Sequence, residues 1–168
     1  GFYRSERGPE GQPGRAPDDL AAIVDQLGIQ RFHLVGTAAG AFTVTDYAQS
    51  HPDRLLSITL ASSLGGIDEP EFTAQTERLL PPDWRTLPAE FCEIGPSYRA
   101  ANPEGVKRWL DLERSSKSSP AILQGKANRT TWESLRRIAV PTLILTGDAD
   151  LYFPPSRLRA VSEHLPRS

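Results

Sequence analysis

A short apolar segment that runs directly into a cluster of small residues constrains this chain most. Residues 31–35 read Arg-Phe-His-Leu-Val and predict a buried β-strand, while residues 36–40 read Gly-Thr-Ala-Ala-Gly. A helical pattern follows over 39–50 and ends at a His-Pro pair, because the residue before a proline disfavours helix. This order predicts a sharp strand-to-helix bend with residue 38 at its tip.

Other segments continue an alternation of helices and strands. Asp18 and Asp19 precede an apolar periodicity that predicts a helix of about ten residues, with Gly28 as its stop signal. The remaining predictions are strands at 55–61 and 140–146 and helices at 132–138 and 155–165. Strands that alternate with crossover helices favour parallel pairing, so we predict the α/β class with a partial, doubly wound parallel sheet.

Residues 64–133 interrupt this alternation. The stretch contains seven prolines and no strand pattern, and it indicates helices at 72–80 and 106–113. It is too long for a simple connection, and we interpret it as a helical insertion of the kind that covers a site. We therefore divide the chain into a first core part (1–63), an insertion (64–133) and a second core part (134–168).

Charge and composition exclude several classes of function. The 19 basic and 21 acidic residues give a net charge of −2, so there is no basic excess to neutralise phosphates, and we expect no nucleic-acid partner. No apolar run is long enough to span a membrane.

A single cysteine, Cys92, cannot form an intrachain disulfide and fits a reducing, cytoplasmic compartment. Its thiol is expected to be a small buried group rather than a nucleophile.

We also expect neither a metal ion nor an organic cofactor. No group of histidine, cysteine and acidic residues has the spacing of metal ligands. The glycines at 36 and 40 lack the Gly-x-Gly-x-x-Gly order of a dinucleotide site. The expected partner is a small-molecule substrate or ligand.

The bend at 36–40, together with an acidic loop after the strand at 140–146, resembles the α/β-hydrolase family. The segments that carry the resemblance are Gly1-Phe2-Tyr3-Arg4-Ser5, 19–29, 31–40, Tyr47-Ala48, 51–54 and 140–150. The likeness is greatest to the branch of carbon–carbon bond hydrolases, esterases and epoxide hydrolases that carries a helical cap. It implies hydrolysis of an ester or a related small organic substrate by a nucleophile, an acid and a histidine.

The resemblance implies three site residues. Ala38 occupies the nucleophile position, the backbone N–H of Ala39 belongs to the oxyanion hole, and Asp150 occupies the position of the triad acid. Asp148 is the rival for that last position, and a turn-capping role is open to these loop carboxylates. The alternative interpretation of 36–40 is an ordinary tight connection in an α/β protein.

Three departures from the family pattern bear on activity. Ala38 stands where the family has a serine or another nucleophile, and a methyl group cannot attack a carbonyl. The histidines, at positions 33, 51 and 164, match no catalytic position, and His33 is expected to be structural. The first four strands and the last strand of the family have no counterpart in these residues. We therefore expect a fragment with little or no activity as written.

Three hypotheses remain open from the sequence. The first, which we favour, is a hydrolase lineage with Ala38 at the nucleophile position, where a deliberate substitution would serve to trap a bound substrate. The second is a natural pseudo-hydrolase that binds a small molecule or a protein partner. The third is a partial reading frame that self-associates through an exposed sheet edge at 31–35.

Trp84, Trp109 and Trp132 either line a pocket or pack the insertion against the sheet.

Overall fold

A computed structural model describes residues 9, 11–63, 65–116 and 124–168 of the chain. The segment Gly1–Ser5, which carries part of the family resemblance, lies outside the described residues. The chain divides into two compact units, of which the smaller comprises Gly1–Gly14 and Leu80–Gln124 and the larger comprises Arg15–Leu79 and Gly125–Ser168.

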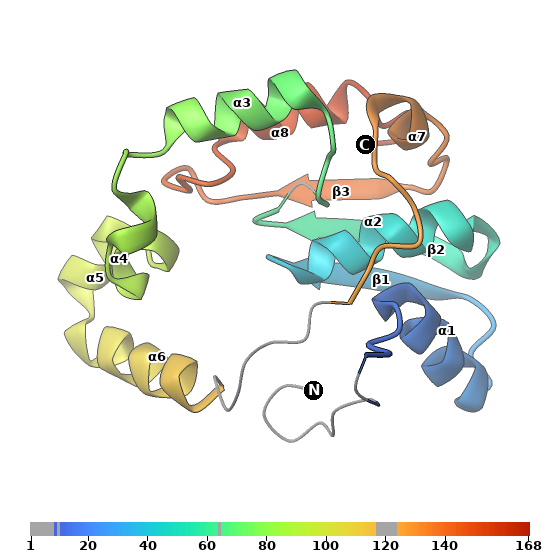
Figure 1. Ribbon diagram of the computed structural model, residues 1–168, viewed down its shortest axis with the longest axis horizontal. Coiled ribbons are helices and arrows are strands. Elements are labelled where there is room, and N and C mark those ends of the chain that lie inside the picture. Colours follow the sequence, from blue (N-terminus) through green and yellow to red (C-terminus); the bar gives the residue numbers. More distant parts are fainter. Residues whose placement is uncertain (1–8, 10, 64, 117–123) are drawn as a thin grey trace. The chain divides into compact units, whose positions relative to one another are not determined.

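A three-stranded parallel sheet forms the framework of the larger unit (Figure 1). Its strands are β1 (Phe32–Thr37), β2 (Leu55–Ala61) and β3 (Thr142–Leu145), in the order β1-β2-β3. The register pairs Thr37 with Ala61 and Ala61 with Leu145, so the three strands end at one common edge, here called the carboxyl edge. The predicted α/β class and parallel sheet are confirmed.

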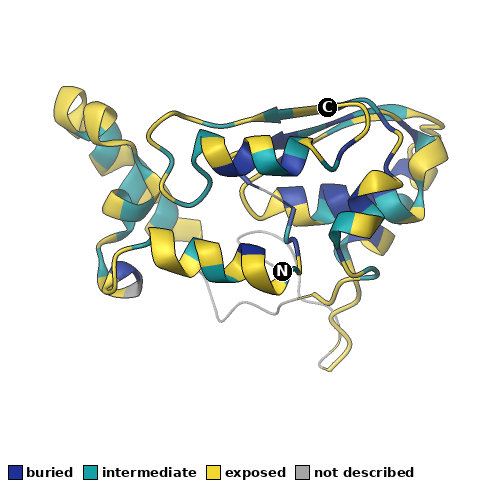
Figure 2. Cartoon of the chain, turned by 90° about the horizontal axis from the view of Figure 1, so that it is seen from above, coloured by how far each residue is buried: buried dark blue, intermediate teal, exposed yellow. Residues whose placement is uncertain are grey.

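Helices of the larger unit cover one face of this sheet, as Figure 2 shows from above. They are α1 (Ala16–Gln26), α2 (Gly40–Ser50), α3 (Pro70–Leu79), α7 (Trp132–Arg136) and α8 (Pro155–Ser162), with a short 3₁₀ turn, η1 (Pro52–Arg54), before β2. The core lies between helices and sheet, where α2 buries Val44 and Tyr47 against strand residues such as Ile58. Burial of these apolar side chains is the main favourable term that holds the layers together.

The opposite face of the sheet is exposed, which corrects the prediction of a buried strand at 31–35. Val35 is 63% exposed and Leu143 is 56% exposed, and the register places both beside Thr59 in one row across the sheet. His33 and Ser57 share this face and are hydrogen-bonded at 2.7 Å. The prediction assumed cover on both faces, as is usual for parallel strands, whereas the described helices of the larger unit pack against only one.

The smaller unit is helical in its described part. It contains η2 (Trp84–Thr86), α4 (Ala89–Glu93), α5 (Pro96–Ala101) and α6 (Pro103–Ser116). Cys92, on α4, is half-buried rather than buried as predicted. The boundaries predicted for the insertion, 64 and 133, stay a prediction. The division into compact units follows other limits, because α3 and α7 belong to the larger unit.

No helix in the described part of the chain combines the length and apolar character that a membrane crossing requires.

Candidate active site at the carboxyl edge of the sheet

Ala38 forms the tip of the bend between β1 and α2. Its φ of 47° lies in the left-handed region, where a side chain is disfavoured. The N–H of Ala38 donates to the carbonyl of Ala61 at 3.0 Å, and the carbonyl of Ala38 accepts from the N–H of Ala41 at 3.1 Å. One residue thus ends the ladder of the sheet and begins the helical hydrogen bonding, which is the sharp bend that the sequence predicted.

The two glycines of the bend have different roles. A Cβ atom on Gly36 would lie 2.5 Å from Cγ2 of Val44 and 2.7 Å from the backbone of Gly40, so β1 and α2 approach closely only because this residue has no side chain. A Cβ atom on Gly40 would meet nothing within 4 Å. The close packing of β1 on α2 therefore requires glycine at position 36 and not at position 40.

The start of α2 directly follows the tip. Ala39 is the N-cap residue of this helix, and its methyl group makes no capping hydrogen bond. Backbone N–H groups in a first helical turn carry partial positive charge and have no partner within the helix. This position can therefore stabilise a negatively charged oxygen, and the oxyanion role of Ala39 stays a prediction.

Asp150 lies in the loop that follows β3, and its carboxylate is held by local contacts. Oδ2 accepts a hydrogen bond of 2.9 Å from the hydroxyl of Thr146, and Oδ1 accepts one of 2.9 Å from the N–H of Phe153. The turn-capping geometry that the sequence left open is present. A carboxylate oxygen has two lone pairs, so each oxygen can still accept a further hydrogen bond. The rival carboxylate, Asp148, is exposed.

Ala38 and Asp150 both follow strands at the carboxyl edge of the sheet. The arrows of β1, β2 and β3 point the same way in Figure 1, and each of the two residues follows the end of an outer strand of this sheet. The middle strand, β2, separates them. The arrangement places a helix N-terminus at one end of this edge and a fixed carboxylate near the other.

The three histidines lie away from the carboxyl edge that carries Ala38 and Asp150. His33 is on the exposed sheet face, His51 packs on Tyr47 with ring centroids 4.7 Å apart, and His164 stacks on Trp132 at 4.1 Å. Trp132 also meets Phe72 at 5.0 Å, so this tryptophan packs in the core of the larger unit rather than lining a pocket. Among the described residues no group of three His, Cys, Asp or Glu side chains could hold a metal ion.

The thiol of Cys92 is not activated. Burial raises its pKa, and the carboxylates of Glu93 and Glu90 raise it further. A raised pKa leaves less thiolate at neutral pH, and the thiolate is the nucleophilic form.

Asp46 has a structural role that sequence analysis missed. Its buried carboxylate accepts hydrogen bonds from the N–H of Ala127 at 2.8 Å and from the N–H of Asn128 at 2.9 Å. The amide side chain of Asn128 adds a third at 2.8 Å. This contact, called the Asp46 clamp below, fixes the segment that returns to the core before α7. A lone acid within a helical pattern carries no sequence signal for such a role.

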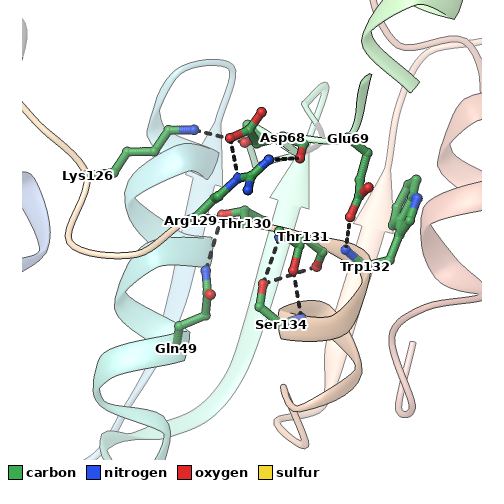
Figure 3. Close-up of polar contacts among 10 residues, drawn as sticks. Gln49, Asp68, Glu69, Lys126, Arg129, Thr130, Thr131, Trp132 and Ser134 are labelled. Carbon is green, nitrogen blue, oxygen red and sulfur yellow. Dashed lines mark hydrogen bonds and ion pairs between the residues drawn. The ribbon is translucent and has the colours of Figure 1, made fainter. Parts of the chain in front are cut away.

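A second network joins this returning segment to the segment that leaves β2 (Figure 3). The N–H of Asp68 donates to the carbonyl of Thr130 at 2.7 Å, and Arg129 pairs with the Asp68 carboxylate at 2.7 Å. Glu69 accepts from the N–H of Trp132 at 2.8 Å. Residues 66–69 and 126–134 therefore meet beside α2, although about sixty residues separate them in sequence.

The bend, the parallel sheet and the acidic loop together define a hydrolase-type α/β architecture, and the chain belongs to the α/β-hydrolase fold family. The profile of that family, described as alpha/beta hydrolase fold, matches residues 1–99.

Individual relatives agree with this assignment. A protein of Pantoea ananatis (strain LMG 20103) named "Putative carbamate hydrolase RutD" is 25% identical over 169 aligned residues, which are 89% of this chain and 58% of that protein. A thermophilic esterase from Thermogutta terrifontis, solved with malate bound, is 25% identical with a TM-score of 0.65, over 90% of this chain and 60% of that one.

The esterase RhEst1 from Rhodococcus sp. ECU1013 superimposes with a TM-score of 0.69 over 98% of this chain and 64% of that one, at 18% identity. At this identity the similarity concerns the fold alone. This chain thus spans about three fifths of the length of these relatives.

Proposed function

We propose that the chain is a protein of hydrolase lineage whose carboxyl edge binds an ester or a related small organic substrate. One observation carries the proposal: Ala38, at a strained strand-to-helix tip, and the oriented carboxylate of Asp150 follow parallel strands at the same edge. The hydrolase relatives support an acyl compound as the ligand class.

The proposed roles follow from this geometry. Residue 38 is the position from which a nucleophile would attack a carbonyl carbon, the N–H of Ala39 would bind the resulting oxyanion, and Asp150 would orient a histidine. Because Ala38 has no nucleophilic atom, we propose binding with little or no turnover. We also propose that the insertion 64–133 acts as a cap that shapes the pocket.

Restoring a nucleophile tests the lineage. In the protein expressed from its complete gene, Ala38→Ser is expected to confer hydrolysis of p-nitrophenyl butyrate, measured by release of p-nitrophenolate. Ala38→Gly is the matched control, because glycine accommodates the left-handed backbone but provides no hydroxyl. Equal rates for the serine and glycine variants, both at the level of buffer alone, would count against the proposal.

A non-catalytic pseudo-hydrolase is the second candidate, with a small molecule or a protein as its partner. It is favoured by the retention of φ 47° at a residue that is neither glycine nor a nucleophile. Such a conformation costs about 1–2 kcal/mol for an L-residue and persists only where the surrounding structure enforces it. Saturable binding of an ester with no product, in both the unmodified protein and Ala38→Ser, would favour this candidate.

We further propose a cytoplasmic location and no nucleic-acid or membrane partner, from the single cysteine and the near-neutral charge. Self-association through the outer strand β1 is a separate proposal, supported by the exposed position of Val35 on that strand.

A further inference from the structure

A second residue at the carboxyl edge has the same unusual backbone as the tip. Among the described residues, only two that are not glycine have a positive φ: Ala38 at 47° and Ser62 at 49°. Ser62 directly follows β2, as Ala38 directly follows β1, and the residues before them, Ala61 and Thr37, are paired in the sheet. The two strained residues are therefore neighbours.

The hydrogen bonds of these residues also correspond. The N–H of Ala38 donates to the carbonyl of Ala61 on β2 at 3.0 Å, and the N–H of Ser62 donates to the carbonyl of Leu145 on β3 at 2.9 Å. Because the two residues share a left-handed φ and the same bond to the next strand, we expect their side chains to project from the edge in a similar direction. Ser62 therefore presents a hydroxyl in the way that Ala38 presents its methyl group.

The position of Ser62 is central in the candidate site. Because the strand order is β1-β2-β3, a ligand that reaches from Ala38 to the loop of Asp150 must pass over the end of β2, where Ser62 lies. Ser62 is exposed, and its hydroxyl forms no hydrogen bond with another described residue. The neighbouring Ser63 is buried and cannot serve in its place.

The strain at Ser62 has no structural explanation within the fold. The turn that follows already contains Gly65 and Gly66, both with positive φ, and glycine at position 62 would adopt the same conformation without cost. Strained residues at the edge of a site are commonly retained for what their side chains do there.

We propose that Ser62 is a ligand-binding residue of the site and that its hydroxyl donates a hydrogen bond to the carbonyl oxygen of a bound acyl compound. This inference rests on the proposed function and adds a third position, supplied by the middle strand, to the bend and the acidic loop.

A pair of matched ligands tests the hydrogen bond. Ethyl butyrate and butyl ethyl ether have the same chain length, but only the ester has a carbonyl oxygen. Titration of the full chain, followed by saturation-transfer NMR, is expected to show tighter binding of the ester. Ser62→Ala is expected to weaken ester binding by about threefold to tenfold, the effect of one neutral hydrogen bond, and to leave ether binding unchanged. Ser63→Ala is the control and should bind both ligands as the unmodified protein does.

A stability measurement tests the strain without any ligand. Ser62→Gly removes the hydroxyl and relieves the left-handed backbone, and it is expected to raise Tm by about 2 °C while weakening ester binding as much as Ser62→Ala does. A Tm that falls in Ser62→Gly would contradict the claim of strain.

The outcomes separate the two proposals. If the unmodified protein binds the ester and Ser62→Ala binds it equally well, the role of Ser62 is overturned while the proposed function stands. If the unmodified protein binds neither ligand, and Ala38→Ser also fails to hydrolyse esters, the proposed function fails and the role of Ser62 fails with it.

Discussion

Gly36 and Gly40 occupy equivalent places in the sequence motif but meet different surroundings. A methyl group on Gly36 would overlap Val44 and the backbone of Gly40, so Gly36→Ala must push β1 away from α2. We expect a loss of about 1–3 kcal/mol in unfolding free energy, the usual cost of overpacking. Gly40→Ala is the control, and it should be neutral or slightly stabilising because its space is open and alanine favours helix. Urea unfolding measures both, and an equal loss in the two variants would refute this account.

The described part of the core contains one tyrosine, Tyr47, whose buried hydroxyl lowers the stability of the fold. Its ring is fully buried, and its hydroxyl has no hydrogen-bond partner among the described residues. Burial raises the pKa of this phenol, an effect that nearby Arg54 opposes and Asp25 reinforces. The folded protein therefore keeps Tyr47 neutral at a pH where the unfolded chain has ionised it.

The raised pKa predicts the direction of the pH dependence. Neutral Tyr47 contributes fully to the unfolding free energy below the pKa of tyrosine in the unfolded chain, which is near 10. This contribution is lost as the pH rises further, so the unfolding free energy falls in alkali. Tyr47→Phe should be as stable as the unmodified protein, or more stable by up to about 1 kcal/mol, at pH 7. Between about pH 9 and 11 the unfolding free energy of Tyr47→Phe should fall less than that of the unmodified protein. The difference is the part of the fall that ionisation of Tyr47 causes. Thermal unfolding across this range is the measurement, and an identical alkaline loss in both proteins would contradict the assignment.

The elements that could be predicted from the sequence are those with a regular apolar period. The periodicity of α1, α2 and α8 and the apolar runs of β1 and β2 are long enough to identify each element, with ends shifted by a few residues. The third strand is shorter than 140–146 because it begins after Pro141, which has no N–H to donate. The helices α4 and α5 span only a turn or so each, too short for a period to emerge.

The site was predictable only in part. Gly36 and Gly40 indicated the bend at Ala38, since glycine is the usual signal of a close approach or of a left-handed backbone. Ser62 gave no such signal, because Ala-Ser-Ser has no turn signature, and its conformation depends on the pairing of β2 with β3. The role of Asp46 depends on residues 127 and 128, far along the chain, so no local pattern could reveal it.

The Asp46 clamp should determine how firmly the returning segment is held. Asp46→Ala removes three hydrogen bonds and leaves the N–H groups of Ala127 and Asn128 without an acceptor, at an expected cost of about 2–4 kcal/mol. Hydrogen exchange of those two amides should accelerate strongly. Asp25→Ala is the control, because Asp25 is an exposed partner of Arg54 and such ion pairs contribute little. Unchanged exchange at residues 127 and 128 in Asp46→Ala would show that the clamp is not stabilising.

At the scale of the whole molecule, the exposed outer strand predicts association between chains. An unpaired strand edge beside an apolar face is a template for pairing with another copy. We expect the sedimentation coefficient to rise with protein concentration, and Val35→Lys to suppress that rise by placing a charge on β1. Leu112→Lys is the control, because Leu112 is 60% exposed but lies on α6 of the smaller unit. A sedimentation coefficient that is independent of concentration in the unmodified protein would dispose of this prediction.

The meeting of residues 66–69 with residues 126–134 also has an evolutionary consequence. Both ends of the intervening stretch are anchored at one place in the larger unit, so its length and sequence can vary while the anchor points stay fixed. Lengthening a closed loop is inexpensive, at about 0.6 kcal/mol for each doubling of a flexible connection. A lineage with this architecture can therefore exchange or lengthen the intervening stretch without changing the sheet and helices of the larger unit.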